Sequence, residues 1–153
     1  MINILKSLIT GLIASLAFEP IAIWAFAIIS LGLWYQLISK QHFKQRLQTS
    51  YFFGLGVLLP TQMWTGIYVG NLPWLILCVA QACFFMIPAF FVGKARKFNR
   101  GAFICSYVIV ELTLRTLPFT GFGWSRLAFS QVDSPLSSAY PLLGVAAVAL
   151  FLA

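Results

Sequence analysis

The residues best suited to chemistry lie in one polar and aromatic segment, residues 120–136, between two hydrophobic stretches. Arginine can hold a phosphate through two hydrogen bonds, and glycine lets a lipid chain or another loop approach closely. A glutamine amide both donates and accepts, so it can orient an ester carbonyl or tie the loop to itself. Aromatic rings interleaved with such groups suit a surface that is half in lipid and half in water. The candidate lipid-binding residues are Gly121, Phe122, Trp124, Arg126 and Gln131.

Residues of this segment also have structural interpretations. Arg126 beside Trp124 is as well suited to anchoring the segment at a membrane interface as to holding a phosphate. Asp133 fits an N-terminal helix cap as readily as a catalytic role, and Ser134 followed by Pro135 resembles a cap with proline at the first helical position. The tryptophans elsewhere in the chain can all belong to interfacial belts rather than to a pocket: Trp24, Trp34, Trp64 and Trp74.

Glu111 and Arg115 stand four residues apart in the hydrophobic stretch before the segment. This spacing places both side chains on one helix face, and an unpaired carboxylate inside a membrane is costly. The two residues therefore predict a structural ion pair that locks helix packing. The functional alternative is a polar floor beneath residues 120–136, with Arg115 reaching toward lipid phosphate or ester oxygens.

No self-sufficient active site can be assembled from the residue types in this sequence. His42 is the only histidine and is expected across the membrane from the segment, and no serine or cysteine has a credible base and orienting group. Cys78, Cys83 and Cys105 lie inside hydrophobic runs, where free cysteine behaves as a small buried hydrophobe. We therefore predict no catalytic residue, no metal, no disulfide and no cofactor in this chain.

The composition predicts an integral membrane protein. Of 153 residues, 61% are hydrophobic and 8% are charged, which is more apolar material than a soluble core of this size could bury. The net charge of +7 falls in short basic clusters without a recognition helix, which argues against nucleic-acid binding. The clusters around Lys44 and Lys97 should face the cytoplasm under the positive-inside rule, as should the N-terminus.

The basic clusters and turn residues divide the chain into about six transmembrane helices, each of which needs roughly 20 apolar residues. We expect an all-α, polytopic membrane helix bundle in one domain, with residues 118–140 as an outer or interfacial segment. The spans are expected at residues 5–18, 20–38, 50–69, 73–92, 102–117 and 141–153. The last of them stops at Ala153 after 13 residues, so it is interpreted as truncated.

The first expected span is short. Residues 5–18 would form a helix about 21 Å long at 1.5 Å per residue, against a hydrocarbon core of roughly 30 Å. Glu19 and Pro20 interrupt the first hairpin after it. The alternative is a single span over residues 21–38 with an interfacial first helix, which would place the N-terminus outside.

The segment also carries a distinctive order of residues. From Arg115 onward these are Thr120, Gly121, Phe122, Trp124, Ser130, Gln131, Asp133, Pro135, Leu136 and Gly144. Shorter matches are Leu16, Ala17, Phe18 and Pro20, and Phe53, Gly54, Leu55 and Gly56 followed by Trp64. In this order and spacing the chain resembles the N-terminal membrane domain of bacterial apolipoprotein N-acyltransferase. Two departures are Gly123, where many members carry proline, and Glu111, which lies four residues before Arg115 rather than three.

The resemblance implies a multi-pass protein of the bacterial inner membrane, with the segment on the periplasmic side. The complete enzymes of this family take an acyl chain from a phospholipid onto a cysteine and pass it to the N-terminal amine of a diacylglyceryl lipoprotein. Their catalytic Glu, Lys and Cys belong to a nitrilase-like domain, and no residue here matches them.

The chain is therefore expected to bind and orient phospholipid and lipoprotein substrates for a missing nitrilase-like domain, and to be inactive alone. The alternative is a small helical membrane transporter or assembly subunit. Transporters often contain inverted repeats, and no convincing repeat occurs in this sequence.

Overall fold

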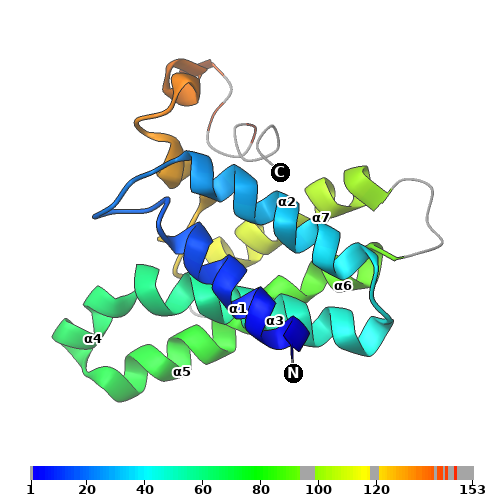
Figure 1. Cartoon of the computed structure of the whole chain (residues 1–153). Helices are drawn as coiled ribbons and strands as arrows, with labels where there is room; N and C mark the ends of the chain where they lie inside the picture. The colour runs from blue at the N-terminus through cyan, green and yellow to red at the C-terminus, as the bar shows by residue number, and fades with distance from the viewer. Residues whose placement is uncertain are drawn as a thin grey trace.

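The computed structural model describes most of the chain as an assembly of helices (Figure 1). The described residues are 2–93, 99–117 and 121–139, together with Pro141, Leu142, Gly144 and Ala147. The α-helices are α1 (Ile2–Ser15), α2 (Ala25–Ser39), α3 (Phe43–Thr61), α4 (Met63–Val69), α5 (Asn71–Ala82), α6 (Ile87–Phe91) and α7 (Asn99–Thr116). Short 3-10 helices are η1 (Cys83–Met86), η2 (Leu127–Gln131) and η3 (Pro135–Ala139). The described residues contain no strand, which confirms the all-α prediction.

The helices overlap the residue ranges in which membrane spans were expected. α1 and α2 form the first hairpin, and the loop between them contains Glu19 and Pro20. A turn at Gly70, with φ +93°, separates α4 from α5. α5, η1 and α6 then follow one another without a gap, and α7 occupies the fifth range. The sixth range, 141–153, lies largely outside the described residues.

The third expected range is divided between two helices. α3 ends at Thr61 and α4 begins at Met63, and their axes differ by 57°. Pro60 lies in the last turn of α3 and lacks a backbone N–H, which favours a kink there.

Length and apolar composition give only a small number of membrane-crossing candidates. In the described part of the chain, one helical stretch, Asn71–Phe91, is long and apolar enough to cross a membrane. The bent pair of α3 and α4 would be a second if the two helices form one span, whereas α1 and α2 are apolar but shorter.

Glycine allows α1 and α3 to approach each other closely. A Cβ atom on Gly11 would lie 2.3 Å from the backbone oxygen of Phe53. A Cβ on Gly56 would lie 2.5 Å from the backbone oxygen of Leu8. No side chain fits at these distances, and small residues at such crossings are typical of helices packed in membranes. This contact fixes the first hairpin on the rest of the bundle.

Trp34 lies at the centre of an aromatic core between α2, α3 and α7. Its side chain is 0% exposed, stacks on Phe53 with ring centroids 4.3 Å apart, and meets Phe103 edge-on at 5.1 Å. Its indole N–H donates to Ser50 Oγ at 3.3 Å. The interpretation of Trp34 as an interfacial residue is therefore wrong, because residues of the neighbouring helices bury the whole side chain.

The cysteines differ in their environments. Cys78 is buried, as expected, whereas Cys83 and Cys105 are exposed, and all are free thiols. The expectation of burial fails for Cys83 and Cys105 because a helix in a hydrophobic stretch also has an outward face.

Candidate functional site

The polar and aromatic segment leaves α7 through a sharp turn at Gly121. This residue has φ +76°, a left-handed conformation that favours glycine. A Cβ there would lie 2.1 Å from the carbonyl carbon of Arg115. The next residue, Phe122, donates its backbone N–H to Leu114 O at 2.8 Å and so satisfies a carbonyl in the last turn of the helix. Gly121 therefore allows another part of the chain to approach closely, and that part is the end of α7.

Buried polar side chains of the helices hold the backbone of the segment in place. Glu111 on α7 is 3% exposed, and its Oε1 accepts the backbone N–H of Leu127 at 2.7 Å. Gln81 on α5 donates through Nε2 to the backbone oxygen of Phe122 at 3.1 Å. Hydrogen bonds of these kinds each contribute about 0.5–3 kcal/mol, more when one partner is charged. The segment is thus fixed from beneath by two helices.

A second polar contact is made at the bend between α3 and α4. Gln62 Nε2 donates to Gln81 Oε1 at 2.6 Å, and both side chains are fully buried. Beside this amide pair, the hydroxyls of Thr61 and Ser125 are hydrogen-bonded at 2.9 Å. These residues were not predicted from the sequence. The available signal was the presence of glutamines inside hydrophobic stretches, where an unpaired amide is costly.

Gln131 is fully buried and ties the segment to the first hairpin. Its Nε2 donates to the backbone oxygen of Trp24 at 3.2 Å and to Ser130 Oγ at 2.9 Å. Of the two roles considered for Gln131, this contact supports the tie, made to the first hairpin rather than within the loop. Two cavities lie beside Trp124, one next to Arg126 and one next to Glu19, and Gln131 lines neither of them.

At the end of the segment, Ser134 caps a short helix. Ser134 Oγ accepts the backbone N–H of Leu136 at 3.1 Å, so Ser134 and Pro135 begin η3 in the predicted arrangement. Asp133 is exposed and precedes this cap.

Two adjoining cavities open at the surface of the segment. The first, of about 390 Å³, is lined by Phe18, Glu19, Thr61, Trp64, Trp124 and Phe129. The second, of about 270 Å³, is lined by Arg115, Gly123, Trp124, Arg126 and Phe129. Trp124 and Phe129 belong to both, so the cavities lie on two sides of the same aromatic pair. The lining of the first cavity is mainly aromatic, and the lining of the second includes two arginines.

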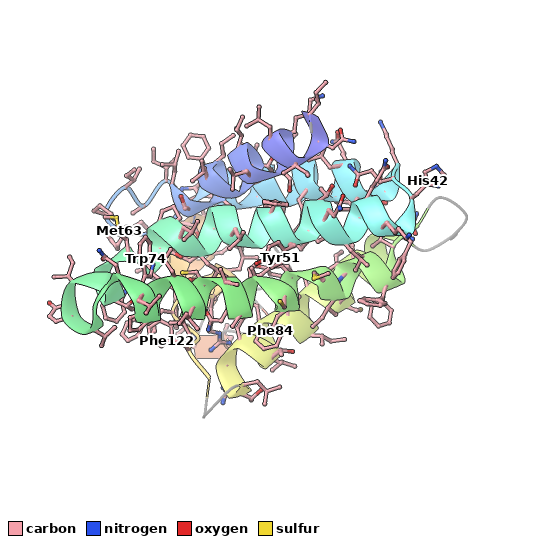
Figure 2. The ribbon with its side chains drawn as sticks, turned by 90° about the horizontal axis from the view of Figure 1, so that it is seen from below. His42, Tyr51, Met63, Trp74, Phe84 and Phe122 are labelled. Atoms are coloured by element: carbon pink, nitrogen blue, oxygen red, sulfur yellow. The ribbon has the colours of Figure 1, made fainter. Side chains whose placement is uncertain are left out.

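An aromatic cluster joins the segment to α4. The ring of Trp64 lies 5.9 Å from that of Phe122 and 5.5 Å from that of Trp124 between centroids. Trp124 is 60% exposed, so a large apolar surface remains uncovered beside the cavities. Figure 2 shows Phe122 toward the end of the bundle that carries Met63 and Trp74, with His42 at the opposite end. The histidine is therefore remote from the site, as the sequence analysis expected.

The structure separates Glu111 from Arg115. Glu111 faces Leu127, whereas Arg115 is exposed and lines the second cavity with Arg126. Within the described residues no ion pair joins Glu111 to Arg115, because the segment lies over the acidic side chain and supplies a backbone donor instead. The predicted ion pair between Glu111 and Arg115 is therefore corrected.

Arg126 has unused hydrogen-bonding capacity. Its guanidinium lies over the ring of Phe129, with 5.6 Å between Cζ and the ring centroid. Its Nε is buried and has no hydrogen-bond partner among the described residues. The missing side chain of Gly123 leaves room beside it, since a Cβ there would lie 3.5 Å from Arg126 Cδ. Two guanidinium groups beside an aromatic surface can hold an anionic group attached to an apolar one.

The described residues contain no group of three or more His, Cys, Asp or Glu side chains placed to hold a metal ion. The groups that line the two cavities are guanidinium, carboxyl, hydroxyl and aromatic side chains.

Together, the fold and this site define a class of protein: an all-α bundle of apolar helices that holds a polar and aromatic segment at one end. A family model described as "Apolipoprotein N-acyltransferase N-terminal domain" matches residues 10–153. The chain therefore belongs to the apolipoprotein N-acyltransferase family, which confirms the resemblance found in its sequence.

Individual relatives carry the same name. The apolipoprotein N-acyltransferase of Vibrio vulnificus is 32% identical over 156 residues, covering 93% of this chain and 31% of the relative. That of Photobacterium profundum is 29% identical over 164 residues, covering 98% and 32%. That of Haemophilus influenzae is 27% identical over 158 residues, covering 96% and 30%. The chain spans about a third of the length of the curated relatives it matches.

Proposed function

We propose that this chain is the membrane-embedded, substrate-binding part of an apolipoprotein N-acyltransferase, and that it binds phospholipid without transferring the acyl chain itself. The observation that carries the proposal is the pair of adjoining cavities on either side of Trp124 and Phe129. One offers two arginines and the other offers mainly aromatic surface. A phospholipid joins an anionic phosphate to acyl chains and so has the same two-part chemistry.

Arg115 and Arg126 would hold the phosphate. Guanidinium groups bind phosphate oxygens through paired hydrogen bonds, and the unpartnered Nε of Arg126 is a donor that such a ligand would use. Glu19 lines the other cavity and offers a carboxylate for an amine. An amine is present both in an ethanolamine head group and at the N-terminus of a lipoprotein acceptor.

The proposed placement is the bacterial inner membrane, with several spans and a cytoplasmic N-terminus. It is supported by the distribution of charge along the bundle: Lys40, Lys44 and Arg46 lie at one end, near His42, and the cavities lie at the other. Under the positive-inside rule the cavities then open at the outer face.

Acyl transfer would depend on a part of the relatives that this chain does not match. The relatives are about three times as long as the chain, which leaves room for a catalytic domain above the cavities. We expect the purified chain, incubated with phospholipid, to form no acyl-thioester. A thioester on Cys78, Cys83 or Cys105 in intact-mass spectra would contradict this part of the proposal.

The binding proposal is tested with phospholipid brominated on its acyl chains, which quenches nearby tryptophan. Wild-type chain in detergent micelles should show saturable quenching. Replacing both Arg115 and Arg126 by alanine should weaken binding by more than about tenfold, because each charge-assisted hydrogen bond contributes about 1.5–3 kcal/mol. Arg100→Ala is the matched control, since Arg100 is exposed on α7 and lines neither cavity. Equal affinities of the double variant and the control would overturn the proposal.

A further inference from the structure

A groove between α1 and α2 follows α1 from Asn3 to Ile13, and its residues Lys6 and Lys40 lie toward the end of the bundle opposite the segment. It has a volume of about 600 Å³, and its lining includes Asn3, Lys6, Ile13, Leu33, Lys40 and Gln41. It includes none of the residues that line the cavities near Trp124.

The groove is polar at one end and apolar along its length. Lys6 comes from the first turns of α1, and Lys40 is the C-cap residue of α2, so the two helices bring their lysines to the same mouth. Deeper positions on the same helices are aliphatic, for example Ile13 and Leu33. The groove therefore has a cationic mouth above an apolar channel.

No acidic side chain of the protein is placed to neutralise these lysines. The chain contains three acidic residues. Glu19 lines the cavity beside Trp124, Glu111 binds the backbone of Leu127, and Asp133 lies near the end of the segment. Both lysines are exposed, so they are accessible to an anionic group from outside the chain.

Amide groups add hydrogen-bonding capacity to the mouth. Gln41 is nearly buried, and its Oε1 accepts from Thr49 Oγ1 at 2.7 Å. Because its oxygen is engaged, the side-chain NH₂ of Gln41 is the group left to bind a ligand, and it is a donor. Ammonium and amide donors together favour a ligand with several acceptor oxygens.

The outward faces of both helices match a lipid environment. Ile9 on α1 is 47% exposed and Leu33 on α2 is 39% exposed, and both line the groove. From Asn3 to Ile13 the groove follows α1 for about 15 Å at 1.5 Å per residue, which is enough for a head group and the first part of its acyl chains. A soluble anion would leave this apolar length unused.

We propose that this groove binds an anionic phospholipid of the cytoplasmic leaflet, with its phosphate between Lys6 and Lys40 and its acyl chains along the aliphatic channel. Basic pockets between helices on that side of a membrane suit anionic head groups. The site is separate from the outer-face substrate site, although its assignment to a leaflet rests on the orientation proposed above.

The test is native mass spectrometry of the full chain, released from micelles containing phosphatidylglycerol and phosphatidylethanolamine in equal amounts. The wild-type chain should retain phosphatidylglycerol in preference to phosphatidylethanolamine. Each of Lys6→Ala and Lys40→Ala should lower this retention about fivefold, since a lysine near a membrane surface contributes about 1 kcal/mol. Replacing both lysines by arginine should preserve the preference, because the charge is kept.

Lys44→Ala is the matched control. Lys44 is an exposed lysine of the same basic cluster that does not line the groove, so its removal should leave retention unchanged. An equal loss of phosphatidylglycerol retention with Lys44→Ala would mean that the basic surface attracts the lipid in general, and it would overturn the proposal. Unchanged retention in the Lys6 and Lys40 variants would also overturn it, because the bound lipid would then lie elsewhere on the protein.

Two further arms separate this site from others. An excess of glycerophosphoglycerol, which has the head group without acyl chains, should not displace the bound lipid, and displacement would identify an anion site rather than a lipid site. The double replacement of Arg115 and Arg126 should leave the preference for phosphatidylglycerol intact, so failure at one site is distinguishable from failure at the other. Far-UV circular dichroism of every variant checks that the bundle is retained.

Discussion

Replacing Gly121 with alanine should detach the segment from the end of α7. Two costs arise at this position. A residue with a Cβ pays roughly 1–2 kcal/mol to adopt a left-handed conformation such as the φ of +76° seen here. In addition, the new methyl group would lie 2.1 Å from the carbonyl carbon of Arg115, so the backbone must move.

This movement of the backbone would weaken or break the hydrogen bonds of the next residue, Phe122. Phe122 donates to Leu114 O at 2.8 Å and accepts from Gln81 Nε2 at 3.1 Å. Each contributes about 0.5–1.5 kcal/mol. With the conformational cost, the total loss of stability should be about 2–5 kcal/mol.

The assay is unfolding by sodium dodecyl sulfate in mixed micelles, followed by far-UV circular dichroism, with limited proteolysis to detect local detachment of residues 121–131. Gly101→Ala is the matched control, because Gly101 lies on α7 and a Cβ added there would have no neighbouring atom within 4 Å. Alanine at this open helical position should gain about 0.5–1 kcal/mol. If Gly121→Ala unfolds at the same concentration of sodium dodecyl sulfate as Gly101→Ala and is cleaved at the same rate, the turn at Gly121 does not hold the segment on α7.

Three other predictions concern the bundle. Glu111→Ala leaves the buried N–H of Leu127 without its acceptor and should cost about 1–3 kcal/mol in the same unfolding assay, whereas Glu111→Gln keeps an acceptor oxygen and should cost less; equal losses would contradict the assigned contact. Gly56→Ala should lose about 1–3 kcal/mol because its Cβ would lie 2.5 Å from Leu8 O, while Gly32→Ala, at an open position on α2, should not be destabilising. Asn71→Cys, in a background without the native cysteines, should react with a membrane-impermeant thiol reagent in intact cells, whereas Lys44→Cys should react only after permeabilisation; the reverse pattern would invert the proposed orientation.

Residue types in the sequence mark two of the breaks between helices. Glu19 and Pro20 lie in the loop between α1 and α2, and Gly70 separates α4 from α5. The bend between α3 and α4 was not predicted, since a proline near a helix end is compatible with either a straight or a kinked continuation.

The contacts of the candidate site residues were not predicted from the sequence. Helical spacing shows that Glu111 and Arg115 share a face, but it does not show which element covers that face. Here the segment covers Glu111 alone, so the expected pair is divided. For the same reason Gln131 could not be recognised as a buried tie to Trp24, which is distant in the sequence.

Of the predicted lipid-binding residues, Trp124 and Arg126 line cavities, and Phe122 packs against Trp64 beside them. Gly121 and Gln131 instead hold the segment in place. Substrate contacts are therefore proposed for the residues that line the cavities, and a positioning role for these two.

The hydrogen bond from Gln131 to Trp24 has a consequence for the order in which the protein is assembled. The two residues are 107 positions apart in the chain. During synthesis, α1 and α2 emerge long before Gln131, so the loop between them cannot take up this contact until nearly all the described helices have been made. Contacts of such separation form late, because the intervening chain must first be ordered. The cavity that Phe18 and Glu19 from that loop line together with Trp124 and Phe129 would then be completed only at the end of assembly, so a nascent chain would not present it while its helices are still being inserted.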